Sequence, residues 1–167
     1  MITINAGQST SFLRIADAIE AAKAYAPMPV TIHIAPGRYH EKLTISQPHV
    51  TLMGDDASNT ILTYDDYARE IMPDGIKRGT FRTYTLFLDA PDITLCNLTV
   101  ENAAGSGKEV GQAIALYAEG EGIRVENCRF IGSEPNTCYL GRPWREYAKV
   151  VILNSEIGDH IKPEGWH

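Results

Sequence analysis

The strongest constraint on the fold is an eight-residue pattern that recurs along the chain. It occurs at residues 93–100, 123–130 and 150–157, with apolar residues at positions one, three and eight and asparagine at position five. The copies are offset by 30 and then by 27 residues, and residues 50–54 form an earlier relative with glycine at position five. Short units repeated in this way are typical of solenoids, in which each unit packs only against its neighbours.

Position five of the repeat indicates how the units are joined. Asparagine and glycine both tolerate the left-handed backbone conformation that lets a strand turn a corner. When such corners stack, each asparagine amide can bond to the next one and satisfy polar groups that would otherwise be buried without a partner. This pattern predicts a parallel β-helix. The alternative is a meander or a sandwich, but those folds favour hairpin dipeptides such as Asn-Gly, and no Asn-Gly occurs in the chain.

The first half of the chain adds a helix and several short strands. Residues 12–25 have apolar side chains at helical spacing, and Ser9, Thr10 and Ser11 precede them as candidate caps. From there the apolar period changes to two, which predicts strands at residues 30–34, 43–45 and 50–52. We therefore expect a helix that caps the N-terminal end of the solenoid.

Composition excludes several classes of function. With 15 Lys and Arg against 21 Asp and Glu, the chain has a formal charge of −6 and no basic run, which argues against binding to nucleic acid. The longest apolar run, residues 113–118, is far shorter than the roughly 20 residues that cross a bilayer, so we expect no membrane segment. The 167 residues fit one domain, and we expect a monomer. The first residues show no signal-peptide pattern, which leaves the compartment open.

The cysteines and histidines do not indicate a metal site. Cys96, Cys128 and Cys138 cannot all pair and are not clustered, so we expect them to pack as small apolar side chains. The histidines are dispersed along the sequence and form neither a ligand cluster nor a Ser-His-Asp pattern, so surface or packing roles are expected for His33, His40, His49, His160 and His167.

The most specific string in the chain is Leu-Gly-Arg-Pro-Trp at residues 140–144. Arg142 stands between glycine and a rigid proline, and Trp144 follows two residues later. A guanidinium beside a broad aromatic face suits sugars that carry carboxylates. The alternative is a turn whose tryptophan covers the core.

Several motifs together make the chain resemble the pectin methylesterase, or pectinesterase, family of carbohydrate esterases. The match at residues 140–144 is complete, and four other segments follow the family pattern in order. They are Gly-Arg-Tyr-His-Glu at 37–41, Gly-Thr-Phe-Arg at 79–82, Gln-Ala-Ile-Ala-Leu at 112–116 and Pro-Glu-Gly-Trp at 163–166. The resemblance covers nearly the whole chain.

The resemblance implies a right-handed parallel β-helix that hydrolyses galacturonate methyl esters in pectin and releases methanol, without metal or cofactor. The family uses one aspartate as nucleophile and a second as general acid and base. By motif, Gln112 takes an oxyanion or substrate-binding role and Arg142 orients the nucleophile and contacts substrate. Thr80 and Trp144 are expected to bind substrate.

The chain departs from the family where the catalytic aspartates should be. The family motifs Gln-Asp-Thr-Leu and Asp-Phe-Ile-Phe-Gly are absent, and residues 116–140 contain no aspartate. We therefore expect one pectinesterase-like domain, residues 1–167, that has lost central coils near residues 133–139. Such a loss is mechanically possible because neighbouring coils of a solenoid can still stack after others are removed.

Aspartates elsewhere could in principle replace the missing pair. Asp55 with Asp56, and Asp65 with Asp66, are adjacent pairs whose side chains would point in opposite directions on a strand, and we interpret them as acidic loop residues. Three hypotheses for function remain: a pectinesterase of doubtful activity, an inactive β-helix that binds pectin or oligogalacturonate, and a solenoid fragment without a ligand.

Overall fold

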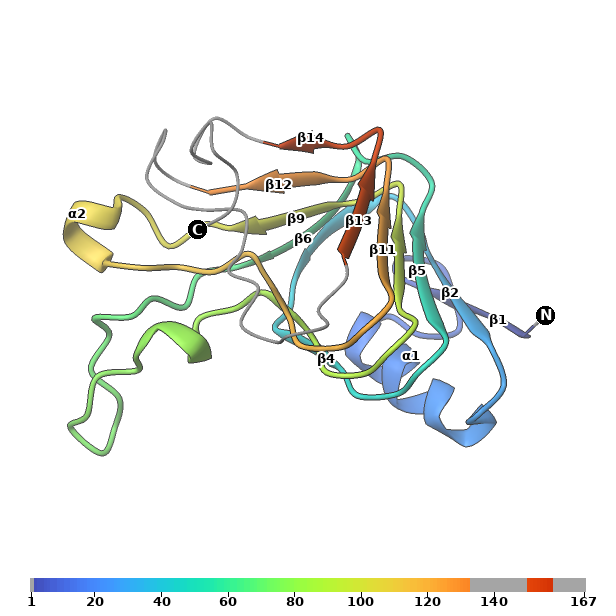
Figure 1. The fold of residues 1–167 in the computed structure, drawn as a ribbon, viewed down its shortest axis with the longest axis horizontal. Helices are drawn as coiled ribbons and strands as arrows, with labels where there is room; N and C mark the ends of the chain where they lie inside the picture. Colours follow the sequence, from blue (N-terminus) through green and yellow to red (C-terminus); the bar gives the residue numbers. More distant parts are fainter. Residues whose placement is uncertain (1, 133–149, 158–167) are drawn as a thin grey trace.

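In a computed structural model, which describes residues 2–132 and 150–157, the chain winds into a β-helix with three sheets (Figure 1). The first sheet contains β1 (Ile2–Ala6), β2 (Val30–Ile34), β5 (Val50–Gly54), β8 (Thr94–Cys96), β11 (Ile123–Glu126) and β13 (Val150–Leu153). The second sheet contains β3 (Gly37–His40), β6 (Thr60–Tyr64), β9 (Thr99–Asn102), β12 (Arg129–Ile131) and β14 (Glu156–Ile157). The third contains β4 (Leu43–Ile45), β7 (Leu86–Leu88) and β10 (Leu116–Ala118).

The pairing between these strands is parallel throughout, which confirms the predicted right-handed parallel β-helix and excludes a meander or sandwich. The register follows the sequence repeat: Arg124 pairs with Thr94, and Ile123 pairs with Val150. Each eight-residue copy folds as two short strands, one in the first sheet and one in the second, separated by a corner.

The asparagines at position five occupy these corners in the predicted left-handed conformation. The φ angles of Asn97, Asn127 and Asn154 are 54°, 51° and 48°. The Asn127 amide donates to Oδ1 of Asn97 at 3.3 Å, so neighbouring corners are linked as expected. The expected burial of these amides is wrong, because Asn127 and Asn154 are exposed and Asn97 is half-buried.

Gly54 occupies the same corner for a different reason than the one predicted. It is not among the residues with positive φ. A Cβ atom at this position would lie 2.3 Å from the carbonyl oxygen of Asn97 and 2.8 Å from Cβ of Thr60. Glycine is required here because the neighbouring backbone approaches closely.

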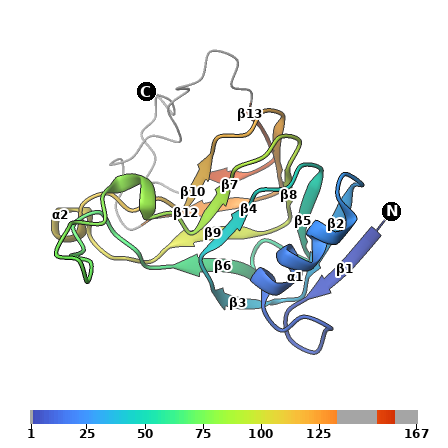
Figure 2. The same ribbon diagram turned by 90° about the horizontal axis from the view of Figure 1, so that it is seen from below.

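The predicted N-terminal helix is α1 (Ile15–Ala22), followed by the 3-10 turn η1 (Lys23–Tyr25). It contacts β1, β2 and β4 and covers the N-terminal end of the β-helix, as expected (Figure 2). The predicted caps are wrong, because the hydroxyl of Thr10 bonds to the carbonyl of Gly7. The carboxylate of Glu41 instead accepts the main-chain N–H groups of Ile15 and Ala16, both at 3.0 Å.

The core consists of inward-facing aliphatic side chains that stack from coil to coil. One row in the first sheet is in register through Ile4, Ile32, Leu52, Leu95 and Val125. Cys128 is buried in this core and Cys96 is half-buried, and both are free thiols. Packing is therefore confirmed for Cys128, whereas Cys138 lies outside the described residues.

The connections between the second and third sheets differ greatly in length. The first such connection is only residues 41–42, whereas the next two are residues 65–85 and 103–115. These long connections carry η2 (Thr80–Arg82) and α2 (Gly107–Val110) and project from the same side of the β-helix (Figure 1). Within the described part of the chain, no helix is long and apolar enough to cross a membrane.

Candidate functional site

Two of the four predicted site residues lie in the described structure, and they are in contact. Thr80 is in η2 on the connection at residues 65–85, and Gln112 is on the connection at 103–115. The Thr80 hydroxyl donates a hydrogen bond to Oε1 of Gln112 across 32 positions of sequence. Arg142 and Trp144 lie outside the described residues.

Main-chain hydrogen bonds between the two long connections hold this pair in place. The N–H of Ala68 donates to the carbonyl of Gln112 at 2.9 Å, and the N–H of Arg69 donates to the carbonyl of Val110 at 3.1 Å. Gly79, the residue before Thr80, donates to the carbonyl of Ala68 at 3.1 Å. Both predicted site residues are therefore fixed to the same short stretch of backbone.

A buried asparagine at the end of β9 ties these connections to the core. Nδ2 of Asn102 lies 3.1, 2.9 and 3.2 Å from the carbonyl oxygens of Asp66, Thr83 and Ile114, and its Oδ1 accepts the N–H of Ala104 at 3.0 Å. The Asn102 side chain is almost completely buried. Sequence reasoning missed this residue, although a polar side chain at an inward strand position is a usable signal.

A group of four charged side chains braces the base of the connection at residues 65–85. Arg78 contacts Asp66 at 2.9 Å and Glu70 at 2.7 Å, and Lys42 also bonds to Asp66. The hydrogen bond from Arg78 lowers the pKa of Glu70. These contacts fix Asp66 between two cations and anchor the base of the connection.

The adjacent aspartate pairs behave partly as predicted. Asp65 is exposed and contacts His40 at 3.1 Å, while Asp66 points to the other side, which confirms the opposite orientations. Asp66 is buried, however, so the interpretation as an exposed loop residue is wrong for it. Asp55 and Asp56 are both exposed.

An aromatic strip, defined here as Phe81, Tyr84, Phe87 and Tyr117, follows the outer side of the third sheet. Phe87 and Tyr117 are register partners and stack with ring centroids 4.7 Å apart at 12°. Tyr84 lies 5.2 Å from Phe87, and Phe81 lies 5.9 Å from Tyr117. Sequence reasoning missed the strip, although the alternation of Phe87 with buried leucines in β7 was visible.

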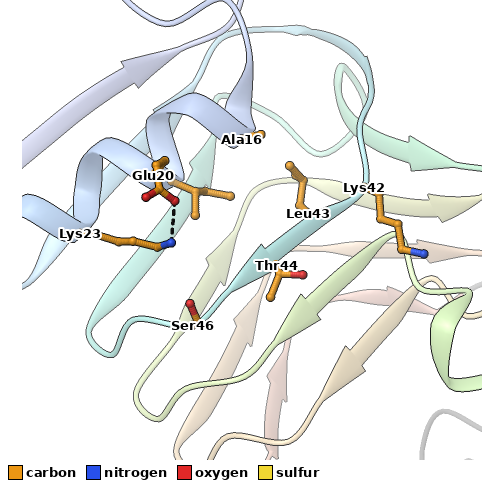
Figure 3. Close-up of a pocket in the computed structure, with 8 residues that line it drawn as sticks. Ala16, Glu20, Lys23, Lys42, Leu43, Thr44 and Ser46 are labelled. Carbon is orange, nitrogen blue, oxygen red and sulfur yellow. Dashed lines mark hydrogen bonds and ion pairs between the residues drawn. The ribbon is translucent and has the colours of Figure 1, made fainter.

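A shallow groove of about 310 Å³ lies between α1 and β4 at the end of the third sheet (Figure 3). The ion pair between Lys23 and Glu20, at 2.5 Å, crosses one side of it. Its lining residues are Ala16, Ile19, Glu20, Lys23, Lys42, Leu43, Thr44 and Ser46. Thr44 is also the register partner of Phe87, so the groove adjoins the aromatic strip.

The three described histidines each contact an aspartate. The contacts are His33 with Asp55 at 2.7 Å, His40 with Asp65 at 3.1 Å and His49 with Asp92 at 3.6 Å. Sequence reasoning missed these pairs because the partners are separated by a full coil or more. In the part of the chain that the structure describes, no three His, Cys, Asp or Glu side chains form a group that could hold a metal ion. His160 and His167 lie outside it.

Comparison with known proteins identifies the family. The sequence model of the pectinesterase family matches residues 1–136 and, separately, residues 119–167. The chain belongs to the pectinesterase family. Two curated relatives from Arabidopsis thaliana are similar to this pectinesterase-family chain. Probable pectinesterase 49 is 33% identical over 142 residues, which cover 83% of this chain and 37% of the relative.

The second relative, Probable pectinesterase/pectinesterase inhibitor 23, is 26% identical over 240 residues, which cover 93% of this chain and 41% of the relative. The chain thus spans about two fifths of the length of these curated relatives. Among solved structures, a mutant pectin methylesterase in complex with a hexasaccharide has a similar fold. Its TM-score is 0.74 at 24% identity, over 94% of this chain and 49% of that one.

Proposed function

We propose that this pectinesterase-family chain binds methyl-esterified galacturonan, the backbone of pectin, and has little or no esterase activity. The observation that carries the proposal is the hydrogen bond between Thr80 and Gln112. It joins two residues of separate family motifs on one side of the β-helix. The hexasaccharide bound to a pectin methylesterase of similar fold supports a saccharide as the ligand.

The contact also defines what Gln112 can offer a ligand. Because Oε1 of Gln112 accepts the Thr80 hydroxyl, its Nε2 protons remain to donate to an ester carbonyl or a sugar hydroxyl. Such a donor would stabilise the negative charge that develops on a carbonyl oxygen during ester hydrolysis. This group on its own supplies no nucleophile.

The proposed loss of activity follows from the missing aspartates. Residues 116–140 contain no aspartate. The two segments of the chain that match the family model, residues 1–136 and 119–167, overlap at residues 119–136. The 240-residue alignment with Probable pectinesterase/pectinesterase inhibitor 23 is longer than this chain of 167 residues, so it passes over residues without a counterpart here. Both observations support the loss of central coils near residues 133–139 from one domain.

Asp66 does not restore the missing chemistry. It is buried, and its two carboxylate oxygens are held by Lys42 and Arg78. A carboxylate engaged by two cations is a poor nucleophile, since attack requires an oxygen lone pair that is free to reach the ester. Asp66 therefore serves as an anchor of the loop.

Two measurements on the purified chain test this proposal. We expect calorimetric titration with methyl-esterified oligogalacturonate to show binding, and methanol release from highly methylated pectin to stay at background. Gln112→Ala should weaken binding, whereas the exposed control Gln8→Ala should not. Methanol release above background that Gln112→Ala abolishes would show an active esterase. Failure to bind at millimolar sugar would instead favour a solenoid without a ligand.

A further inference from the structure

Tyr84 and Phe87 form an aromatic surface, with ring planes tilted by 44°, that does not include either of the two motif residues Thr80 and Gln112. Phe87 is in β7 and its side chain lies in an outward-facing row between Thr44 and Tyr117. Tyr84 flanks it at 5.2 Å, and the hydroxyls of Tyr84 and Thr44 are 3.3 Å apart. Both rings are half-buried, so each rests on the sheet and keeps part of its surface open.

The cation beside this surface already has an anionic partner. Nζ of Lys42 lies 4.6 Å from the centre of the Tyr84 ring. The same ammonium donates to the carboxylate of Asp66 and, at 2.5 Å, to the main-chain carbonyl of Arg82. These two hydrogen bonds use two of the three ammonium protons, and the charge of Lys42 is paired with that of Asp66. A carboxylate laid on the rings would have to compete with Asp66 for this cation.

We propose that Tyr84 and Phe87 form a subsite for a methyl-esterified galacturonate unit, one strand away from the strand that follows Gln112. The inference rests on the proposed function and names the unit that this part of the surface selects. The apolar face of a pyranose ring can pack against the exposed part of an aromatic side chain. The methyl ester is neutral and can be desolvated there, whereas a free carboxylate would lose water beside a cation that Asp66 already neutralises.

The position of the subsite allows one saccharide to contact both the aromatic subsite and the Thr80 and Gln112 pair. Neighbouring strands of the third sheet are about 4.8 Å apart, and the aromatic strip continues through Tyr117 to Phe81. Phe81 directly follows Thr80 in the chain. A saccharide laid along the third sheet would therefore extend from the Thr80 and Gln112 pair across Phe87.

Calorimetric titration with two ligands tests this subsite: hexagalacturonate in fully methyl-esterified form and the same hexamer as the free acid. We expect the unmodified chain to bind the esterified hexamer more tightly. Phe87→Leu and Tyr84→Leu should each weaken that binding by about 3- to 10-fold. Tyr64→Leu is the matched control because Tyr64 packs against His40 in the second sheet, and it should change affinity by less than about twofold.

The outcomes separate this subsite from the proposed function. If the unmodified chain binds neither hexamer, both are overturned. If it binds, but Phe87→Leu and Tyr84→Leu leave the affinity unchanged, only the subsite is overturned. Tighter binding of the free acid would refute the preference for the ester. Nitration of tyrosines in the unmodified chain provides a test without variants: the esterified hexamer should protect Tyr84 and leave Tyr64 reactive, and equal reactivity of Tyr84 with and without the hexamer would overturn the subsite.

Discussion

Gly54 and Asn127 occupy the same corner of the β-helix in different coils, and each meets a different physical requirement. Asn127 has φ of 51°, where glycine is also comfortable. Gly54 instead faces the carbonyl oxygen of Asn97, which would lie 2.3 Å from an added Cβ. The two residues should therefore respond differently to substitution.

We expect Gly54→Ala to lower the free energy of unfolding by about 3 kcal/mol, because the backbone of the neighbouring coil would have to move. Asn127→Gly should cost less than about 1 kcal/mol, since glycine adopts the same φ and only an exposed hydrogen bond between the side-chain amides of Asn127 and Asn97 is lost. Urea unfolding of both variants measures the difference. Equal costs would show that crowding at Gly54 does not limit the residue there.

Cys128 provides a residue-scale test of burial. Burial raises its pKa to about 11, because the apolar surroundings disfavour the thiolate. At pH 8 only about 0.1% of the thiol is then ionised, and the thiolate is the form that reacts. Iodoacetamide should modify Cys96 before Cys128 in the folded chain and both equally in urea, as followed by peptide mass spectrometry. Faster modification of Cys128 when folded would contradict its place in the core.

Local residue preferences could be predicted from the sequence where the residue's own side chain determines its backbone conformation. The left-handed corners at Asn97, Asn127 and Asn154 follow from asparagine chemistry alone. The reason for Gly54 could not be predicted, because the atom that crowds it belongs to a residue of the next coil. The burial of Asp66 depends in the same way on partners that are distant in sequence, Lys42 and Arg78.

At the scale of elements, α1 depends on a cap from another coil. Glu41→Ala removes the carboxylate that accepts the N–H groups of Ile15 and Ala16. We expect a loss of about 1–2 kcal/mol in unfolding free energy and faster hydrogen exchange at those two amides. Glu20→Ala is the control, because Glu20 forms an exposed pair with Lys23 and should contribute less than about 0.5 kcal/mol. Unchanged exchange at Ile15 would contradict this cap.

The long connections depend similarly on Asn102. Asn102→Ala removes the side-chain donor from the carbonyls of Asp66 and Thr83, whereas Ile114 keeps the N–H of Thr85. We therefore expect a loss of about 2–3 kcal/mol and weaker binding of oligogalacturonate. Asn5→Ala, at an exposed position in β1, should stay within about 0.5 kcal/mol of the unmodified chain. Urea unfolding and calorimetry report the two effects. Full binding by Asn102→Ala would mean that Thr80 and Gln112 are held in place without the hydrogen bonds of the Asn102 side chain.

The motif pattern predicts that Thr80 and Gln112 both bind substrate, but it could not show that the two side chains are in contact. Their separation in sequence is large, and the bonds from Ala68 and Gly79 that align them involve no unusual residue types. The aromatic strip has the same origin, since the register of β7 and β10 brings Phe87 and Tyr117 together.

For the whole molecule, the repeat was sufficient to predict a parallel solenoid. Its offsets of 30 and 27 residues reappear as strand register. The proposed loss of coils can therefore be tested directly by adding coils back to the chain. Replacing residues 133–139 with the central coils of a longer pectinesterase should give methanol release from methylated pectin. The same insert with its two aspartates changed to asparagine should give none. A folded chimera that binds pectin but releases no methanol would show that missing coils are not the reason for inactivity.

The connection between β3 and β4 needs only residues 41–42 to lead the chain from the second sheet to the third. The corresponding segments at residues 65–85 and 103–115 therefore contain far more chain than winding requires. The core can be inherited unchanged while those segments diverge, so new saccharide specificities can arise, or be engineered, by exchanging them between members of the fold.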